Sequence, residues 1–152
     1  MDALQLLKED HEKVKKILND LDATTERGVK TREELFTKVR KELEVHEAIE
    51  EEIFYPALKE HPKAKEIVLE GYEEHHVVDT VMAEIAEVPF EDETWGAKLT
   101  VMKENVEHHI EEEEDQMFTQ ARQVLSKEEL RELGERMQSR KEELLAQHRT
   151  SA

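Results

Sequence analysis

From His46 the chain reads HEAIEEEIFYPAL, and from His109 it reads HIEEEEDQMF. Each segment opens on a histidine that stands four residues before a glutamate, Glu50 in the first and Glu113 in the second. Side chains at this spacing project from one face of an α-helix about one turn apart, so both can reach a single ion or two adjacent ions. The sequence therefore predicts two helices that each present a histidine together with a glutamate.

A second pair of segments supplies one more histidine each. Asp10-His11 and Glu74-His75 both place an acidic residue directly before a histidine. These two histidines are 64 residues apart, and the two of the first pair are 63 residues apart. The matching separations indicate an internal repeat, in which two helical hairpins of similar length stack with pseudo-two-fold symmetry.

Apolar residues recur at steps of three and four around these histidines, which is typical of amphipathic helices. Capping boxes at Thr31-x-x-Glu34 and Ser126-x-x-Glu129, and a proline at position 62, mark three helix starts. The expected helices span residues 4–21, 31–57, 62–85, 99–117 and 126–144. The inward stripe of the second is expected to be Leu35, Val39, Leu43, Ile53 and Ala57.

Short connections between long helices favour an antiparallel arrangement. The predicted fold is therefore all-α, an antiparallel up-and-down four-helix bundle with an additional C-terminal helix. Residues 1–125 are expected to form the bundle. Residues 126–152 are expected to form a C-terminal helix packed on the bundle and a short tail, with packing of that helix between two copies as the alternative.

The composition excludes several classes of function. The 152 residues include 22 basic and 39 acidic side chains, a formal net charge of −17. Nucleic acids and anionic membranes repel so acidic a surface. The chain has no cysteine, which excludes disulfides, thiolate metal sites and thiol nucleophiles. Neither a membrane-spanning stretch nor a signal-peptide core is recognisable, so the expected location is the cytoplasm.

The predicted helices bring four histidines and two glutamates together inside the bundle. Two buried carboxylates without partners would be very unfavourable, whereas a divalent metal removes that cost. Imidazole and carboxylate ligands without thiolate suit iron, manganese or zinc. Six side chains are too many for one tetrahedral zinc, and they suit two octahedral ions that share carboxylates and an oxo or hydroxo bridge. The candidate ligands of this di-iron centre are His11, His46, Glu50, His75, His109 and Glu113.

Residues 3–122 resemble the hemerythrin-like, or HHE cation-binding, domain family. The resemblance rests on the Asp-His or Glu-His step of two helices and on His-x-x-x-Glu-Glu followed by an aromatic residue on the other two. Thr119 stands where the family usually has a proline. The resemblance implies a non-haem di-iron site that binds or reacts with dioxygen, with Glu50 and Glu113 as bridging ligands.

One departure from the oxygen-carrying hemerythrins bears on function. Their third helix supplies a His-x-x-x-His pair, whereas this chain has Gly71 four residues before His75 and Asp79 four residues after it. A fifth imidazole is therefore absent, and Asp79 and Tyr72 are the open candidates to complete the coordination. A more carboxylate-rich site favours ferric iron, and with it oxidation or peroxide chemistry over reversible oxygen binding.

The predicted function is a non-haem di-iron protein for dioxygen or another small diatomic or peroxide ligand, in sensing, storage or redox protection. A dedicated enzyme is not expected, although peroxidase- or catalase-like activity stays open. The alternatives are a peroxide-removing or iron-storing protein, a ferritin-like site, for which only Glu73-x-x-His76 fits, and a non-metal acidic interaction module. His76 and His108 adjoin the chosen histidines and would be the ligands if the helix register were shifted by one residue. Glu51 and Glu114 are candidate acceptors for histidine N–H groups. The protein is expected to be a monomer or homodimer.

Overall fold

The computed structural model describes the backbone of residues 1–151 and the side chains of residues 1–149. This part of the chain forms five long helical rods, two of which contain a short π-helical turn. In chain order the elements are α1 (Ala3–Asp22), α2 (Val29–Ile49), η1 (Glu50–Phe54), α3 (Tyr55–Lys59), α4 (Pro62–Ala86), α5 (Trp95–Glu112), η2 (Glu113–Met117), α6 (Phe118–Val124) and α7 (Lys127–Ser151).

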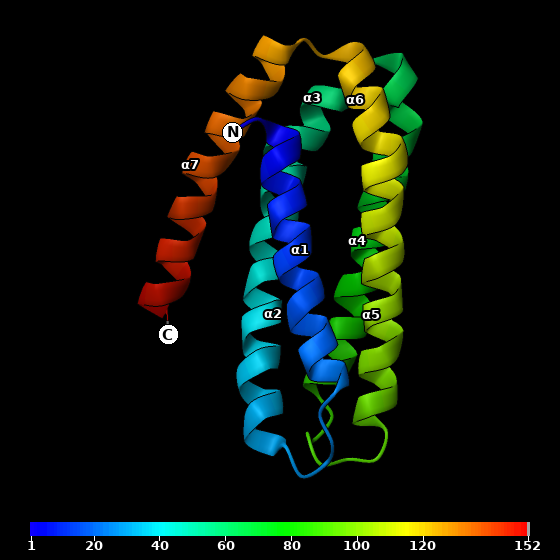
Figure 1. Ribbon diagram of the computed structural model, residues 1–152, viewed down its shortest axis with the longest axis vertical. Helices are drawn as coiled ribbons and strands as arrows, with labels where there is room; N and C mark the ends of the chain where they lie inside the picture. The colour runs from blue at the N-terminus through cyan, green and yellow to red at the C-terminus, as the bar shows by residue number, and fades with distance from the viewer. Residues whose placement is uncertain (152) are drawn as a thin grey trace.

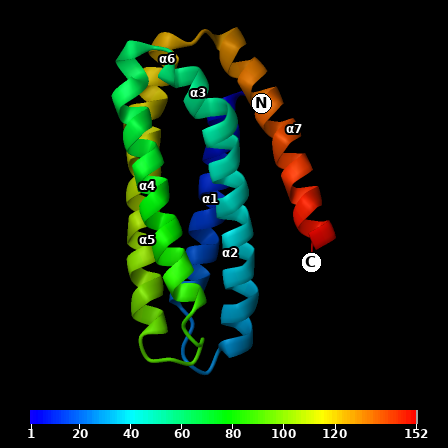
Figure 2. The same cartoon turned by 180° about the vertical axis from the view of Figure 1, so that it is seen from behind.

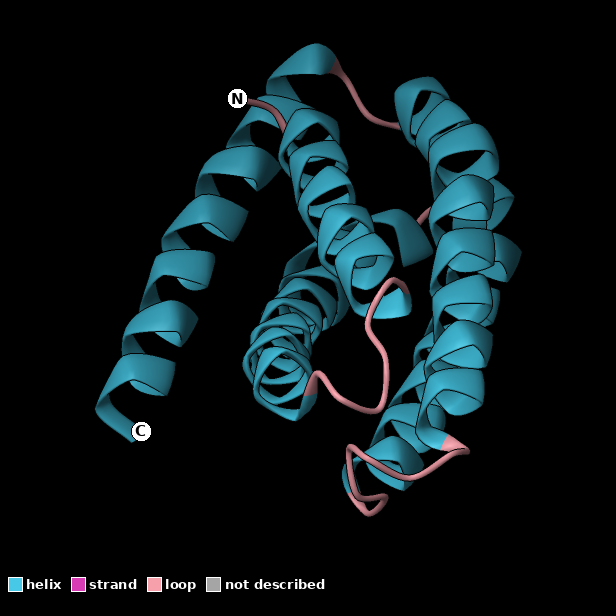
Figure 3. Cartoon of the chain, turned by 60° about the horizontal axis from the view of Figure 1, so that its bottom comes forward, coloured by secondary structure: helices cyan, strands magenta, loops and turns pink. Residues whose placement is uncertain are grey.

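Four of the rods run alternately up and down and enclose one core (Figure 1). The same order is seen from behind, where α7 lies outside the bundle beside α2 (Figure 2). The connections that follow α1 and α4 lie together at one end of the bundle (Figure 3). No strand occurs among residues 1–151. The predicted all-α up-and-down bundle with an additional C-terminal helix is confirmed.

Two of the three predicted helix starts are confirmed. Pro62 is the first residue of α4, and Ser126 and Glu129 cap α7 through reciprocal side-chain bonds of 3.0 Å to each other's backbone N–H. The predicted start at Thr31 was wrong, because α2 already begins at Val29. Serine or threonine three residues before glutamate also occurs inside a helix, and here a turn ending at Gly28 reverses the chain first.

The helices that carry His46 and His109 each contain one π-helical turn, and both turns begin at the glutamate of the His-x-x-x-Glu pair. In the first, the N–H of Tyr55 donates to the carbonyl of Glu50, five residues earlier. In the second, the N–H of Phe118 donates to the carbonyl of Glu113. Single π-turns of this kind are frequent at functional sites, where they insert one extra residue into the helix.

The extra residue changes which side chains face the core. An uninterrupted α-helix would bury Ile53 and Ala57, as the sequence analysis expected, but both are only half-buried. Phe54, Tyr55 and Leu58 are fully buried instead. The prediction for Ile53 and Ala57 was therefore wrong, because the π-turn rotates the helix that follows it by about one residue.

The apolar core is divided into two clusters along the bundle axis. One surrounds Leu7, Phe54 and Phe118 and includes residues of α7, and the other surrounds Val14 and Met102 and continues to the α1–α2 and α4–α5 connections. His11 lies on α1 between Leu7 and Val14, at the level where the clusters separate. The bundle thus has an apolar core above and below one buried polar layer.

Helix α7 packs against α1 and α2 through a buried stripe of Leu130, Leu133 and Met137. Gly134 lies on the same face and touches the first residues of the chain. A Cβ added there would lie 2.5 Å from the carbonyl oxygen of Met1, so glycine is required for the close approach of these two segments. Among the described helices, none is long and apolar enough to cross a membrane.

Candidate metal centre

The buried polar layer consists of the six residues that the sequence analysis selected. They come from α1, α4 and the two helices with π-turns, and each has an exposed fraction of 6% or less. Their donor atoms form two overlapping groups, in each of which all atoms lie within 4.8 Å of one another. The first group is His11, His46, Glu50 and Glu113, and the second is Glu50, His75, His109 and Glu113.

Each of the two shared glutamates contacts one histidine of either group. The contacts are His46 Nε2–Glu50 Oε1 at 3.3 Å, His75 Nε2–Glu50 Oε1 at 3.0 Å, His11 Nε2–Glu113 Oε1 at 3.1 Å and His109 Nε2–Glu113 Oε2 at 3.2 Å. The four imidazoles thus turn their Nε2 atoms toward the two carboxylates. These six side chains would hold metal between the imidazole nitrogens and the carboxylate oxygens.

Three atoms of this layer have no hydrogen-bond partner among the described residues. They are Nε2 of His46, Nε2 of His109 and Oε2 of Glu50, all fully enclosed. A buried polar atom without a partner is destabilising by about 1–3 kcal/mol, so such atoms call for an ion or another unrecorded partner. All three are potential metal donors that face the interior. The donor set of imidazole nitrogens and carboxylate oxygens fits two first-row metal ions.

The outer nitrogen of every histidine is also held by a carboxylate. His11 Nδ1 donates to Glu114 and His75 Nδ1 donates to Glu51, each at 2.7 Å, as the sequence analysis anticipated. His46 Nδ1 donates to Asp10 at 2.9 Å, and His109 Nδ1 donates to Glu74 at 2.8 Å. Such carboxylates fix the tautomer and orientation of metal-binding histidines. The roles of Asp10 and Glu74 were missed, although the acidic residue directly before His11 and His75 was the available signal.

Tyr55 reaches the layer from the first π-turn. Its hydroxyl donates to Oε2 of Glu113 at 2.8 Å and lies 3.4 Å from Nε2 of His75. The ring stacks on that of His75, with centroids 5.3 Å apart. A Cβ added to Gly71 would lie 2.8 Å from the hydroxyl oxygen, so only glycine at this position leaves room for the tyrosine. Tyr55 occupies the space that a side chain four residues before His75 would need.

The repeat places Phe118 where symmetry would put a second tyrosine. Phe118 follows Glu113 by five residues, as Tyr55 follows Glu50, and its ring stacks on His11 with centroids 6.1 Å apart. The two halves of the layer therefore have the same architecture but differ by one hydroxyl. That hydroxyl lies beside the group formed with His75 and not beside the group formed with His11.

The fold and this geometry agree with a known family. The model of the hemerythrin HHE cation-binding domain matches residues 2–121. The chain belongs to this family. Among solved structures, a hemerythrin HHE cation-binding domain-containing protein from Mycobacterium kansasii is similar, with a TM-score of 0.84 and 28% sequence identity over 95% of this chain and 87% of that chain. None of the curated proteins matches the chain.

Several other candidates lie outside the polar layer of this HHE domain. Asp79 is exposed, and Tyr72 is half-buried with its ring against Tyr55, so neither joins the two donor groups. His76 and His108 are exposed, which removes the register alternatives. The ferritin-like alternative also fails, because Glu73 is exposed as well.

Without metal, the HHE layer is held together by charge. Burial lowers the pKa of His75 and His109, but hydrogen bonds to their carboxylate partners outweigh it and raise the pKa to about 9 and about 10. The pKa of Glu113 is lowered in spite of burial by its hydrogen bond with Glu50 and by the adjacent imidazoles of His109 and His11. In the metal-free layer His75 and His109 are therefore imidazolium groups paired with carboxylates, and metal binding to them must displace protons.

We expect the metal-free protein to lose stability as the pH rises from 6.5 to 10. The pKa values of His75 and His109 in the folded state lie above their usual value of 6.5, so their contribution is complete below about pH 6.5. It is lost as the pH passes through 9 and 10, with a decrease on the order of a few kcal/mol. Urea unfolding of chelator-treated protein measures this. His109→Gln should flatten the dependence of the unfolding free energy on pH. His108→Gln changes an exposed neighbour and should leave that dependence unchanged. A wild-type free energy that does not vary with pH would contradict the raised pKa values of His75 and His109.

A small cavity borders the layer on the side away from Tyr55. Its volume is about 20 Å³, about the space for one water molecule or a ligand of similar size. The lining consists of the four histidines, Glu47 and five aliphatic side chains, of which four lie one turn from a histidine and Ile110 directly follows His109. Glu47 is buried, and burial together with a hydrogen bond to Asp79 raises its pKa to about 9.

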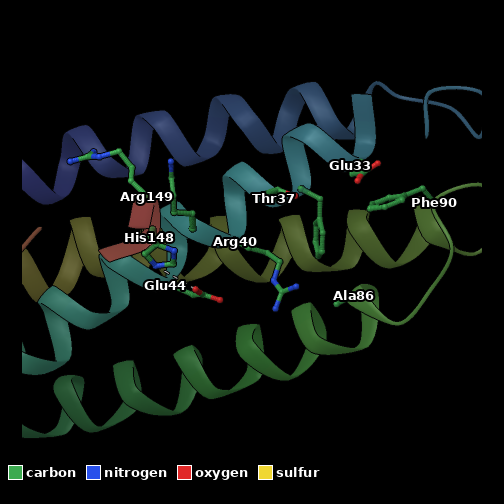
Figure 4. Close-up of a pocket in the computed structure, with 10 residues that line it drawn as sticks. Glu33, Thr37, Arg40, Glu44, Ala86, Phe90, His148 and Arg149 are labelled. Atoms are coloured by element: carbon green, nitrogen blue, oxygen red, sulfur yellow. Dashed lines mark ion pairs between the residues drawn. The ribbon is translucent and has the colours of Figure 1, made fainter. Parts of the chain in front are cut away.

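A larger groove lies on the outer surface between α2, the end of α4 and the end of α7 (Figure 4). Its volume is about 680 Å³, and its lining includes Arg40, Phe90 and His148. His148 from α7 pairs with Glu44 from α2 at 3.8 Å across it. None of the six residues of the buried layer lines this groove. The small interior cavity is therefore the space that adjoins the candidate ligands.

Proposed function

We propose that the chain binds two iron ions in the buried layer and uses them to react with dioxygen or peroxide as a redox-protective protein. The observation that carries the proposal is the pair of donor groups that share Glu50 and Glu113. Two imidazoles in each group, with the two carboxylates between them, match the donor types of non-haem iron. Iron bound there would supply electrons to oxygen or peroxide.

Tyr55 supports reaction over reversible oxygen carriage. In the oxygen-carrying hemerythrins the third helix supplies a His-x-x-x-His pair, whereas here Gly71 stands four residues before His75 and leaves that space to the Tyr55 hydroxyl. Burial and the neighbouring Glu113 raise the pKa of Tyr55, and a cation beside the hydroxyl would reverse this effect and favour phenolate. An anionic oxygen donor stabilises ferric iron more than a neutral imidazole does.

The chain's own residues would provide access and positioning for a small ligand. The interior cavity adjoins all four histidines on the side opposite Tyr55, and its aliphatic lining suits a small, weakly polar molecule. Glu47 lines this cavity and also an outer groove of about 390 Å³ that contains Asp79 and Glu51. Dioxygen or peroxide would therefore reach the layer past Glu47, while Tyr55 closes the opposite side.

The optical spectrum distinguishes reaction from carriage. Protein reconstituted anaerobically with two equivalents of ferrous iron should, on addition of oxygen, develop a ferric spectrum that persists when the oxygen is removed. Hydrogen peroxide should be consumed repeatedly without loss of iron, two molecules giving two of water and one of dioxygen, so that no external reductant is needed. A band that disappears on removal of oxygen would instead assign reversible binding, and protein that retains no iron under anaerobic conditions would contradict the proposal altogether.

A further inference from the structure

We propose that Lys141, on the C-terminal helix, tunes the iron bound by His46 through Asp10. The inference rests on the proposed di-iron function and concerns a residue that the family match does not include, because that match ends at residue 121. Lys141 is thus a positioning residue, since its ammonium group touches no candidate ligand and acts on one through a carboxylate.

The chain of contacts is short and continuous. The Nζ of Lys141 donates to Oδ1 of Asp10 at 2.5 Å, and Oδ2 of the same carboxylate accepts from Nδ1 of His46 at 2.9 Å. The side chain of Asp10 is 6% exposed and that of Lys141 is 19% exposed. A carboxylate shared in this way between a lysine and an imidazole holds the imidazole N–H less strongly than an unshared one.

The other three histidines lack this arrangement. Their carboxylates, Glu51, Glu74 and Glu114, have side chains that are 39%, 27% and 22% exposed. Among the described residues, none of these three pairs with a lysine or an arginine. Asp10 is therefore the buried member of the set and the one with a cationic partner, so the two metal positions have different surroundings.

The position of Lys141 is fixed by the packing of α7. Leu130, Leu133 and Met137 are buried against the bundle on the same helical face, and Gly134 contacts the N-terminal backbone without space for a Cβ. Asp10 lies on α1, seven to nine residues beyond this contact point with the start of the chain. Docking of α7 therefore brings the Lys141 ammonium group to Asp10 as a consequence of apolar packing.

The sign of the effect follows from the charges. The ammonium group attracts the electrons of Asp10, so it makes His46 a weaker donor and adds positive charge near the metal position. Removing it should strengthen His46 as a ligand and favour the ferric state. Removing the carboxylate instead should release the Nδ1–H of His46 and weaken the ligand. The Lys141→Met and Asp10→Asn variants should thus shift metal binding in opposite directions.

The test compares iron affinity and reduction potential in full-length wild type and variants. In Lys141→Met, one of the two one-electron potentials should fall, and ferric iron should bind more tightly by on the order of tenfold. In Asp10→Asn, affinity at one of the two sites should fall by about 10- to 100-fold. Lys141→Arg should restore the wild-type potential. Potentiometric titration followed by electron paramagnetic resonance, together with competition against a chelator, gives these values.

Arg140→Met is the matched control. Arg140 is the neighbouring cation on α7 and pairs with the exposed Glu52 at 2.9 Å, so its removal deletes the same charge without touching a histidine partner. Its potential should stay at the wild-type value. If Lys141 had only a structural role, Lys141→Met would lose affinity as Asp10→Asn does. That result, or an unchanged potential in Lys141→Met when the wild type binds two irons, overturns this inference but not the proposed function. Wild type that takes up no iron overturns the proposed function as well.

Discussion

Glu50→Gln and Glu113→Gln should each lose both metal ions, whereas His46→Ala should lose mainly one. Each glutamate contacts a histidine of both donor groups, so replacing its carboxylate removes a negative oxygen donor from both metal positions. His46 belongs to one group only. We expect the glutamine variants to bind iron more than about 100-fold more weakly, beyond the 10–100-fold typical of residues outside the ligand set.

Metal analysis of anaerobically reconstituted protein measures this difference as iron per chain. Glu111→Gln is the matched control, because Glu111 lies in the same run of glutamates but is exposed, and it should retain the wild-type amount. Circular dichroism verifies that each variant remains helical. Equal retention of iron in Glu50→Gln and wild type would contradict the shared role of Glu50, and unchanged iron in His46→Ala would contradict the assignment of His46 as a ligand.

Tyr55→Phe should change the ferric spectrum and leave the fold intact. The phenylalanine keeps the ring that stacks on His75, and only the hydroxyl bonded to Glu113 is removed. A phenolate bound to ferric iron gives a visible charge-transfer band, which should be present in the wild type and absent in the variant. Tyr72→Phe is the matched control, because its ring only flanks Tyr55, and its spectrum should match that of the wild type.

Gly71→Ala tests the same assignment from the opposite side. The added Cβ would lie 2.8 Å from the Tyr55 hydroxyl and 3.0 Å from the adjoining ring carbon, so the tyrosine must move away. We expect the visible band to be lost and the free energy of unfolding to fall by about 1–3 kcal/mol, as for other overpacked sites. Adding Tyr55→Phe should recover part of this stability, measured by urea unfolding. A wild-type spectrum in both Gly71→Ala and Tyr55→Phe would show that Tyr55 does not reach the iron.

The sequence predicted the bundle and its polar layer because both depend on local spacing. Apolar residues at steps of three and four define the buried face of each helix, and a histidine within that stripe must point inward with it. The four-residue spacing of His46 and Glu50 places both on one turn whatever the rest of the chain does. The internal repeat then indicates that the second pair meets the first. These relations were sufficient to select all six residues of the layer.

The same spacing rule gave the wrong buried face after Glu50. It assumes an uninterrupted α-helix, and the π-turns after Glu50 and Glu113 break that assumption. Tyr72 fitted the stripe and was one of two candidates for the extra donor, whereas the inserted residue turns Tyr55 into the layer. The cause is not local, because the register after the turn depends on how Phe54 and Leu58 fill the core.

The sequence by itself determined a helical HHE bundle with a buried set of four histidines and two glutamates. The tertiary structure decided which other residues act on that set. Gly71 and Tyr55 are 16 residues apart, and Asp10 and Lys141 are 131 residues apart, so their contacts depend on how separate helices pack. Helical periodicity fixes the face on which a side chain lies, but it carries no information about which neighbouring helix meets that face or at what height.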